Sequence, residues 1–360
     1  MSAGGGEPTA EGQDPGGDEL LLLCLSRTDG HELWRRPLGT GNRFHRKHND
    51  SSPSPVTDGK RVCAVTGAAV VSAFDMSGEP MWRRDLQADY GALGTVFGYG
   101  SSPLLTGDTL ILQVLHGYHT DDPSYLVALD AATGETLWRE ERATDAVAES
   151  PDAYTTPALI QREGGSEIVI AGGDYVTGHD PVTGAELWRR GGLNPEKRRN
   201  YRVVGSPVVA GDMLFVPTRK KPLQAFRILP AAEMSGSGPL WIWTGAGSPD
   251  VPTPVAGGGY FYMVDDRGLV TCLDAVTGAV VWGPHRTAEG IVSSSPVLAD
   301  GKLYVTNENG ITTVLAAGAE LAPLAVNELD GSYTLSSMAV ARDQLFIRTA
   351  THLYCIADVN

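Results

Sequence analysis

Two pairs of histidines are the side chains of this sequence best suited to acid–base chemistry or metal binding. His45 and His48 stand three residues apart, and His116 and His119 repeat this spacing. Imidazole titrates near neutral pH and is a common metal ligand. Neither pair lies in an HExxH pattern, and the cysteines have no metal-type spacing. The sequence therefore does not favour a catalytic zinc, and we predict no metal site.

Carboxylates that could complete such a site follow in nearby loops. Asp121 comes two residues after His119, and Glu149 lies in a later polar loop. A calcium site in the segment HTDDPS would lack EF-hand spacing. Because these residues come from separate loops, a shared site requires a fold that brings the loops to one edge.

A ten-residue motif that ends in tryptophan recurs along the chain. It reads LDAATGETLW at 129–138, HDPVTGAELW at 179–188 and LDAVTGAVVW at 273–282. With more divergent copies included, the motif tryptophans are Trp34, Trp82, Trp138, Trp188, Trp241 and Trp282. Their average spacing of about fifty residues is typical of propellers and solenoids.

A second motif lies between the tryptophans and predicts a β-hairpin. It consists of a short apolar run, a Gly/Asp turn and a β-branched or aromatic run, as in SSPVLADGKLYVTN from Ser294. Each unit then has four strands, A to D, with the hairpin forming A and B. In the DxxTG turn before strand D, we expect Asp to accept hydrogen bonds from loop amides and Gly to adopt a left-handed conformation. The tryptophan is expected to pack on the neighbouring sheet.

Four antiparallel strands at this period predict an all-β fold, a β-propeller of four-stranded antiparallel blades, with very little helix. The motif D-A-x-T-G-x-x-x-W resembles that of the PQQ-like (pyrrolo-quinoline quinone repeat) β-propeller family, and the resemblance covers Leu20 to Ile356. It implies that residues 19–360 form one PQQ-like β-propeller. Residues 1–18 cannot bury a core, so we expect a disordered N-terminal tail.

Two blade numbers fit the repeats. The chain has seven A–B hairpins, while strands C and D of a further unit occur at Leu20–Arg36. Because relatives of this layout usually have eight blades, we predict an eight-bladed plan with a truncated first blade. The alternative is seven blades closed by the N-terminal strand, in which Cys24 and Cys355 could approach closely enough for a disulfide. Cys24, Cys272 and Cys355 share one repeat position, where we expect buried free thiols.

The loops from strand D to the next A, and from B to C, are longest and most polar in the first half of the chain. Such loops line one mouth of a propeller channel, so we expect a binding site for a partner or small ligand there. The ligand-binding candidates are His45, His48, Tyr99, His116, His119, Glu149, Tyr154, Tyr201, Arg202, Arg219, Asp250 and Tyr333. We assign no residue a catalytic role.

The quinone dehydrogenases that are similar to this family hold their cofactor beside a pair of adjacent cysteines and use acidic and amide ligands for calcium. The four cysteines of this chain all occur singly, and there is no CxxCH motif. The resemblance therefore concerns architecture, and we predict no cofactor; the apparatus for PQQ is not visible.

Composition restricts the partners and the compartment. The formal net charge is −15, which repels a nucleic-acid backbone, and the longest apolar run, Leu20–Leu25, is too short for a membrane span. Residues 1–18 lack the features of a secretory signal, so a cytoplasmic protein is expected if the start is authentic. The alternative is an exported protein whose signal was lost to a mis-called or truncated start.

Two functions fit these observations. The first is a non-enzymatic binding or scaffold protein that uses the channel-mouth loops to bind a partner or small ligand, as the resemblance to non-enzymatic propellers implies. The alternative is a small-molecule enzyme with a polar or metal-binding site at the channel mouth. In that case His48, His116 and Glu149 are the acid–base or metal candidates.

Overall fold

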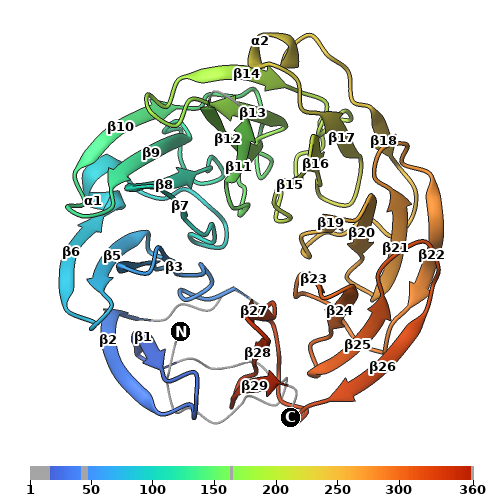
Figure 1. The fold of residues 1–360 in the computed structure, drawn as a ribbon. Coiled ribbons are helices and arrows are strands. Elements are labelled where there is room, and N and C mark those ends of the chain that lie inside the picture. Colours follow the sequence, from blue (N-terminus) through green and yellow to red (C-terminus); the bar gives the residue numbers. More distant parts are fainter. Residues whose placement is uncertain (1–16, 42–47, 163–164, 358–360) are drawn as a thin grey trace. The chain divides into compact units, whose positions relative to one another are not determined.

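The computed structural model describes residues 17–41, 48–162 and 165–357. The predicted tail lies outside these residues up to position 16. The chain divides into two compact units, the first ending at Val203 and the second continuing from Val204. Both are built from antiparallel sheets (Figure 1).

The first unit holds one two-stranded and three four-stranded sheets. The two-stranded sheet pairs β1 (Glu19–Leu25) with β2 (Glu32–Thr40). The four-stranded sheets are β3 (Val56–Thr57), β4 (Arg61–Val65), β5 (Val70–Asp75) and β6 (Pro80–Asp85); β7 (Leu104–Thr106), β8 (Thr109–Val114), β9 (Tyr125–Asp130) and β10 (Thr136–Glu141); and β11 (Ala158–Arg162), β12 (Gly165–Gly172), β13 (Tyr175–His179) and β14 (Glu186–Arg190). Helix α1 (Leu86–Tyr90) follows β6 and is capped by the side chain of Asp85.

The second unit holds three four-stranded sheets and one three-stranded sheet. The four-stranded sheets are β15 (Val208–Ala210), β16 (Met213–Val216), β17 (Leu223–Arg227) and β18 (Trp241–Trp243); β19 (Val255–Gly257), β20 (Tyr260–Val264), β21 (Leu269–Asp274) and β22 (Val280–Arg286); and β23 (Val297–Ala299), β24 (Lys302–Thr306), β25 (Ile311–Ala316) and β26 (Pro323–Glu328). The three-stranded sheet is β27 (Ala339–Ala341), β28 (Gln344–Arg348) and β29 (Leu353–Ala357). Helix α2 (Ala231–Met234) lies between β17 and β18.

Seven sheets contain the predicted A–B hairpin, namely the six four-stranded sheets and β27–β29. This agrees with the seven-bladed alternative. In the described chain, β1 and β2 pair only with each other, so the strands that the eight-bladed plan counts as a separate blade have no A or B strand. The predicted low helix content is confirmed for the described residues, which form two helices of five and four residues. No helix within the described ranges has the length and apolarity needed to cross a membrane.

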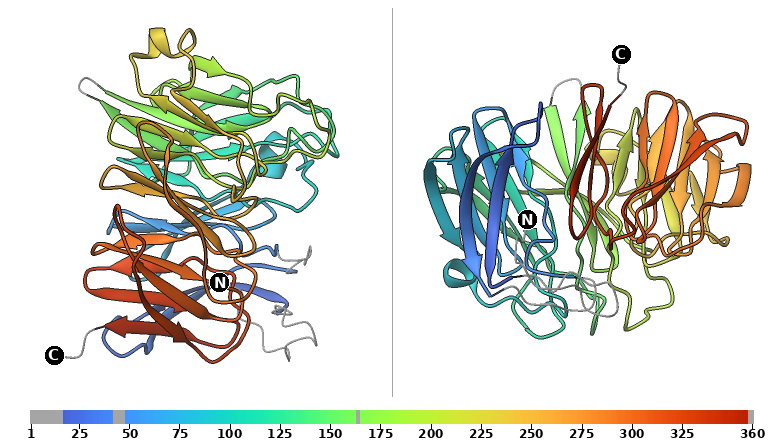
Figure 2. Two further views of the ribbon diagram at one scale, coloured as in Figure 1. Left: turned by 90° about the vertical axis from the view of Figure 1, so that its right-hand side faces the viewer. Right: turned by 90° about the horizontal axis from the view of Figure 1, so that it is seen from below.

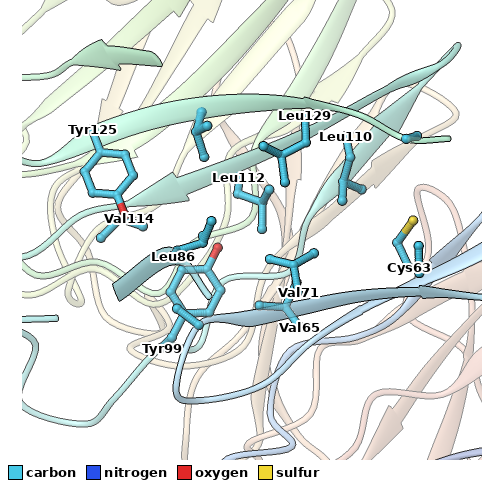
Figure 3. Close-up of a cluster of buried hydrophobic side chains, with 14 residues drawn as sticks. Cys63, Val65, Val71, Leu86, Tyr99, Leu110, Leu112, Val114, Tyr125 and Leu129 are labelled. Carbon is cyan, nitrogen blue, oxygen red and sulfur yellow. The ribbon is translucent and has the colours of Figure 1, made fainter. Parts of the chain in front are cut away.

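The core consists of apolar side chains that lie between successive sheets of a unit. The sheets themselves pack face to face (Figure 2). Strand β9 reads YLVALD and is buried along nearly its whole length, because both of its faces are covered. Figure 3 shows one such layer, in which Val71 of β5 faces Leu112 of β8. The outer strand β6, by contrast, alternates exposed and half-buried residues, since only one face is covered.

Five of the six motif tryptophans dock on the turn before the outer strand of the next sheet in their unit, and for Trp82, Trp138 and Trp241 this is a DxxTG turn. The indole Nε1–H of Trp82 donates to the Ala131 carbonyl oxygen over 3.0 Å. Its ring lies on Gly134, where an added Cβ would be 2.6 Å from the ring and where φ is +75°. The same indole-to-carbonyl bond is made by Trp34, Trp138, Trp241 and Trp282, to Met76, Pro181, Ala275 and Gly318 respectively. We call this contact the tryptophan interlock, and it confirms the predicted packing of the tryptophans.

The turn that receives the tryptophan is shaped by its aspartate. Asp130 Oδ1 accepts hydrogen bonds from the amides of Ala132 and Thr133, as predicted for the DxxTG turn. These bonds favour the charged carboxylate and lower the pKa of Asp130. The aspartate thus holds the turn in the conformation that presents a carbonyl and a glycine to the tryptophan.

The cysteines only partly follow the predicted burial. All four are free thiols; Cys63 and Cys272 are buried, Cys24 is half-buried, and Cys355 is exposed. Cys355 lies on β29, which pairs only with β28 in the described chain. The prediction for Cys355 was wrong because, among the described residues, its own sheet has no outer strand to cover that position.

We predict that Gly134→Ala destabilises the protein more than Gly107→Ala. Both glycines have positive φ, so each substitution costs about 1–2 kcal/mol of backbone strain. Only at Gly134 does the new methyl group also collide with a tryptophan ring, whereas nothing lies within 4 Å of a Cβ at Gly107. Urea unfolding followed by tryptophan fluorescence measures both losses, and equal losses would show that the ring contact contributes nothing.

Candidate functional site

A cluster of aromatic and charged side chains forms the candidate site of the first unit. It consists of His48, Phe97, Glu149, Tyr154 and Arg202, and we call it the rim cluster. Arg202 places its guanidinium carbon 5.3 Å from the centre of the Phe97 ring, within cation–π range. Its Nη1 lies 3.4 Å from Glu149 Oε1. The cluster thus contains a charge pair stacked on an aromatic ring.

Tyr154 joins the other side of the rim cluster. Its hydroxyl oxygen accepts a hydrogen bond from the Phe97 amide over 3.2 Å, and the two ring centres are 6.0 Å apart. The His48 ring centre lies 6.1 Å from that of Tyr154. Gly100 permits this approach, because an added Cβ would lie 3.0 Å from both rings. Burial raises the pKa of Tyr154, so its hydroxyl stays protonated at neutral pH.

Backbone pairing fixes the segments that carry these side chains. The Tyr154 amide donates to the Val203 carbonyl oxygen over 2.9 Å, and the Glu149 amide donates to that of Arg199 over 2.9 Å. Ala153 is also bridged to Leu115. The two long D–A loops, after β10 and after β14, are therefore joined by backbone hydrogen bonds. This pairing orients Glu149 and Arg202 toward each other.

Asp152 lies under the rim cluster and is fully buried. Its Oδ2 accepts from the Val96 amide over 2.9 Å, and its Oδ1 accepts from the Tyr118 amide over 3.2 Å. Burial, with a smaller contribution from the Glu149 charge, raises the pKa of Asp152 to about 6. Asp152 is not among the predicted site residues, because nothing in the sequence distinguishes it from the exposed Asp145 of the same loop.

The two histidine pairs do not form one site in the described chain. His116 is buried; its Nδ1 accepts from the Gly94 amide over 3.1 Å, and its Nε2 lies 3.2 Å from the Pro123 carbonyl oxygen. These bonds require the neutral tautomer with the proton on Nε2, and burial lowers the pKa. His119 is exposed beside Tyr118, and His45 lies outside the described residues. Over the described ranges, no three His, Cys, Asp or Glu side chains are grouped to hold a metal.

The remaining candidates lie elsewhere. Tyr99 and Tyr201 are buried, and Tyr99 belongs to the hydrophobic layer of Figure 3. In the second unit, Arg219 Nε lies 3.6 Å from Asp250 Oδ2. Burial, together with the negative charge of Glu308, raises the pKa of Tyr333 to about 12. Four of the twelve candidates, His48, Glu149, Tyr154 and Arg202, thus lie together in the rim cluster, whereas Tyr99 and Tyr201 are buried.

The sequence of this chain matches the model of a known protein family. A PQQ-repeat profile described as "Outer membrane protein assembly factor BamB" matches residues 18–241 and 233–350. The chain belongs to this family. A curated protein of that name from Burkholderia pseudomallei (strain K96243) is 26% identical over 222 residues, which cover 59% of this chain and 47% of that protein. The chain thus spans about half the length of this relative.

Solved structures agree with the fold. BamB from Moraxella catarrhalis matches with a TM-score of 0.63 at 16% identity, over 92% of this chain and 89% of that chain. A europium-containing methanol dehydrogenase matches with a TM-score of 0.65 at 12% identity, over 92% of this chain and 81% of that chain. Together with the seven hairpin-bearing sheets, these likenesses show a seven-bladed β-propeller of four-stranded antiparallel sheets.

The likeness to a dehydrogenase raises the question of whether this chain has residues that could hold PQQ. Cys24, Cys63, Cys272 and Cys355 lie on four different strands, β1, β4, β21 and β29, so no adjacent pair is present to flank a quinone. The residues of this chain do not fit a cofactor held in that way, and we assign it no step.

We predict that Asp152 makes stability depend on pH. Its pKa is about 6 in the folded chain against 3.8 for the free group, so the folded state keeps a proton that the unfolded state releases. The free energy of unfolding should therefore fall as pH rises from 4 to 7, by about 2 kcal/mol, relative to Asp152→Asn. Urea unfolding of both proteins across this range measures the difference. Parallel pH profiles would contradict the assignment.

Proposed function

We propose that this chain is a non-enzymatic binding protein that holds a partner protein on the loops around the rim cluster. The supporting observation is that two large apolar side chains are exposed on the loops that carry this internally paired cluster. Tyr118 is 48% exposed and Val147 is 46% exposed. The Tyr118 amide is anchored to Asp152, and the Val147 carbonyl accepts from the Ser150 amide, so both project from fixed backbone.

This arrangement has the chemistry of a protein-binding surface. Aromatic residues and arginine dominate the binding energy of protein interfaces, and anchors held in place before binding lose less entropy on association. Arg202 is already stacked on Phe97 and paired with Glu149, so its geometry need not be assembled by the partner. Tyr118 and Val147 supply apolar area that a partner can cover.

The family supports a partner and a compartment for this proposal. The relatives are named as assembly factors for outer membrane proteins. We therefore propose a component that assembles outer membrane proteins as the partner, and favour the exported alternative, since such assembly takes place outside the cytoplasm. The enzyme alternative loses one of its three candidates, because His116 uses both ring nitrogens on backbone groups.

Photo-crosslinking tests this surface. A photoreactive amino acid placed at Tyr118 or Val147 in the native host should trap one and the same protein, while the control site Val182, which is 80% exposed in the same unit, should not. The trapped protein is then purified and its affinity is measured. We expect the double substitution Tyr118→Ser and Arg202→Ala to weaken binding at least tenfold, or about 1.4 kcal/mol.

Val182→Ser serves as the matched substitution control and should leave the affinity unchanged. Equal trapping from all three positions, or unchanged affinity in the double variant, would show that the partner binds elsewhere.

A further inference from the structure

A polar pocket in the second unit is not used by the proposed function. It has a volume of about 480 Å³ and is formed by three loops. These are Lys220 and Lys221 between β16 and β17, residues 244–248 after β18, and residues 265–267 between β20 and β21. We call it the glycine-loop pocket, after the sequence TGAGS at 244–248.

Three cationic side chains surround the glycine-loop pocket. Lys220 makes no side-chain ion pair with any described residue, and its backbone is held at a φ of +73°, an uncommon conformation for a residue with a side chain. Lys221 is its neighbour, and Arg267 is 70% exposed. Arg267 binds Asp265 through Nε and Nη2, which leaves donors on Nη1. The three cations outnumber the two carboxylates of the lining, Asp265 and Asp266, so the pocket has a small excess of positive charge on a chain with a net charge of −15.

The glycine loop adds backbone donors to these cations. The amides of Gly245, Ala246 and Gly247 make no hydrogen bond within the described residues. Gly247 has a φ of +85°, and an added Cβ would lie 3.1 Å from Thr271 Oγ1. A Cβ at Gly245 would lie 2.6 Å from the Trp243 ring. Glycine is thus required at both ends of a short run of open amides, and such runs are common anion-binding sites.

Ser248 and Asp250 supply buried polar atoms at the base of the loop. Ser248 Oγ and Asp250 Oδ1 are both buried and have no hydrogen-bond partner among the described residues. Asp266 Oδ1 accepts from the amides of Asp250 and Val251, which fixes this carboxylate at the wall of the pocket. Because buried polar atoms in folded proteins are nearly always satisfied, a hydroxyl that lines a pocket without a partner indicates a bound group.

We propose that the glycine-loop pocket binds a small molecule that carries a phosphate group. Lys220, Lys221 and Arg267 surround the phosphate, and the amides of Gly245–Gly247 donate to its oxygens. The combined donors exceed what the two oxygens of a carboxylate can accept, which favours phosphate. Ser248 and Asp266 then bind hydroxyl or amine groups on the rest of the molecule. This site goes beyond the proposed function, which rests on other loops in the first unit.

The test is an NMR titration of the purified full chain at constant ionic strength. Inorganic phosphate, glycerol 3-phosphate and acetate are added separately, and the amide signals of Gly245, Ala246 and Gly247 are followed. We expect saturable shifts with phosphate, tighter binding of glycerol 3-phosphate, and weaker binding of acetate. Lys220→Gln should weaken phosphate binding at least fivefold, and Ser248→Ala should weaken glycerol 3-phosphate by a larger factor than inorganic phosphate.

Lys60→Gln is the matched control, because Lys60 is an exposed lysine on a hairpin turn of the first unit. It should leave all three affinities unchanged. The proposal is overturned if the loop amides do not shift, if Lys220→Gln binds phosphate like the wild type, or if acetate saturates the same amides at lower concentration. The wild-type titration alone can give the first and third of these results, so the test does not depend on the folding of a variant.

Discussion

The tryptophan interlock is the contact on which the rest of this structure depends. A sheet of four short strands has two apolar faces and cannot cover them alone, so each sheet is stable only against a neighbour. The interlock fixes that neighbour in one position, because the indole must reach a carbonyl oxygen and, in four of the five cases, must also lie against the open face of a glycine. Trp82 meets both conditions at Ala131 and Gly134, and Trp241 meets them at Ala275 and Gly278. The aspartate, glycine and tryptophan recur in the repeats because each has a part in this contact.

The tryptophan contacts fix the turns before the outer strands, so the remaining loops can differ in length and sequence without loss of the scaffold. Both proposed sites lie on such loops. The rim cluster is built from loops of the first unit that pair with each other through Ala153, so Arg202 and Glu149 are oriented before any partner arrives. The glycine-loop pocket uses shorter loops of the second unit and a glycine conformation that no other residue adopts easily. Trp188 shows that the interlock is not universal, because its Nε1–H donates to Glu167 in its own sheet over 2.8 Å.

The sequence predicted the repeating scaffold well and the site less well, for a physical reason. Local patterns determine the hairpins, the DxxTG turns and the tryptophans, since each depends on residues that are close in sequence or repeated at a fixed period. The role of His116 depends on Gly94 and Pro123, which pack against it only in the folded chain and engage both of its nitrogens. Asp152 has a raised pKa because the fold buries it, and no neighbouring letter signals this. Cys355 is exposed because its sheet lacks an outer strand in the described chain.

Hydrogen exchange of the indole Nε1–H groups tests the central claim most directly. If the interlock holds the sheets together, the indole protons of Trp34, Trp82, Trp138, Trp241 and Trp282 exchange only when a whole unit unfolds. Their opening free energies should then match those of the most protected amides in the buried strands of the same unit. Exchange of these protons at the rate of a solvent-exposed tryptophan, while the strand amides stay protected, would contradict the account.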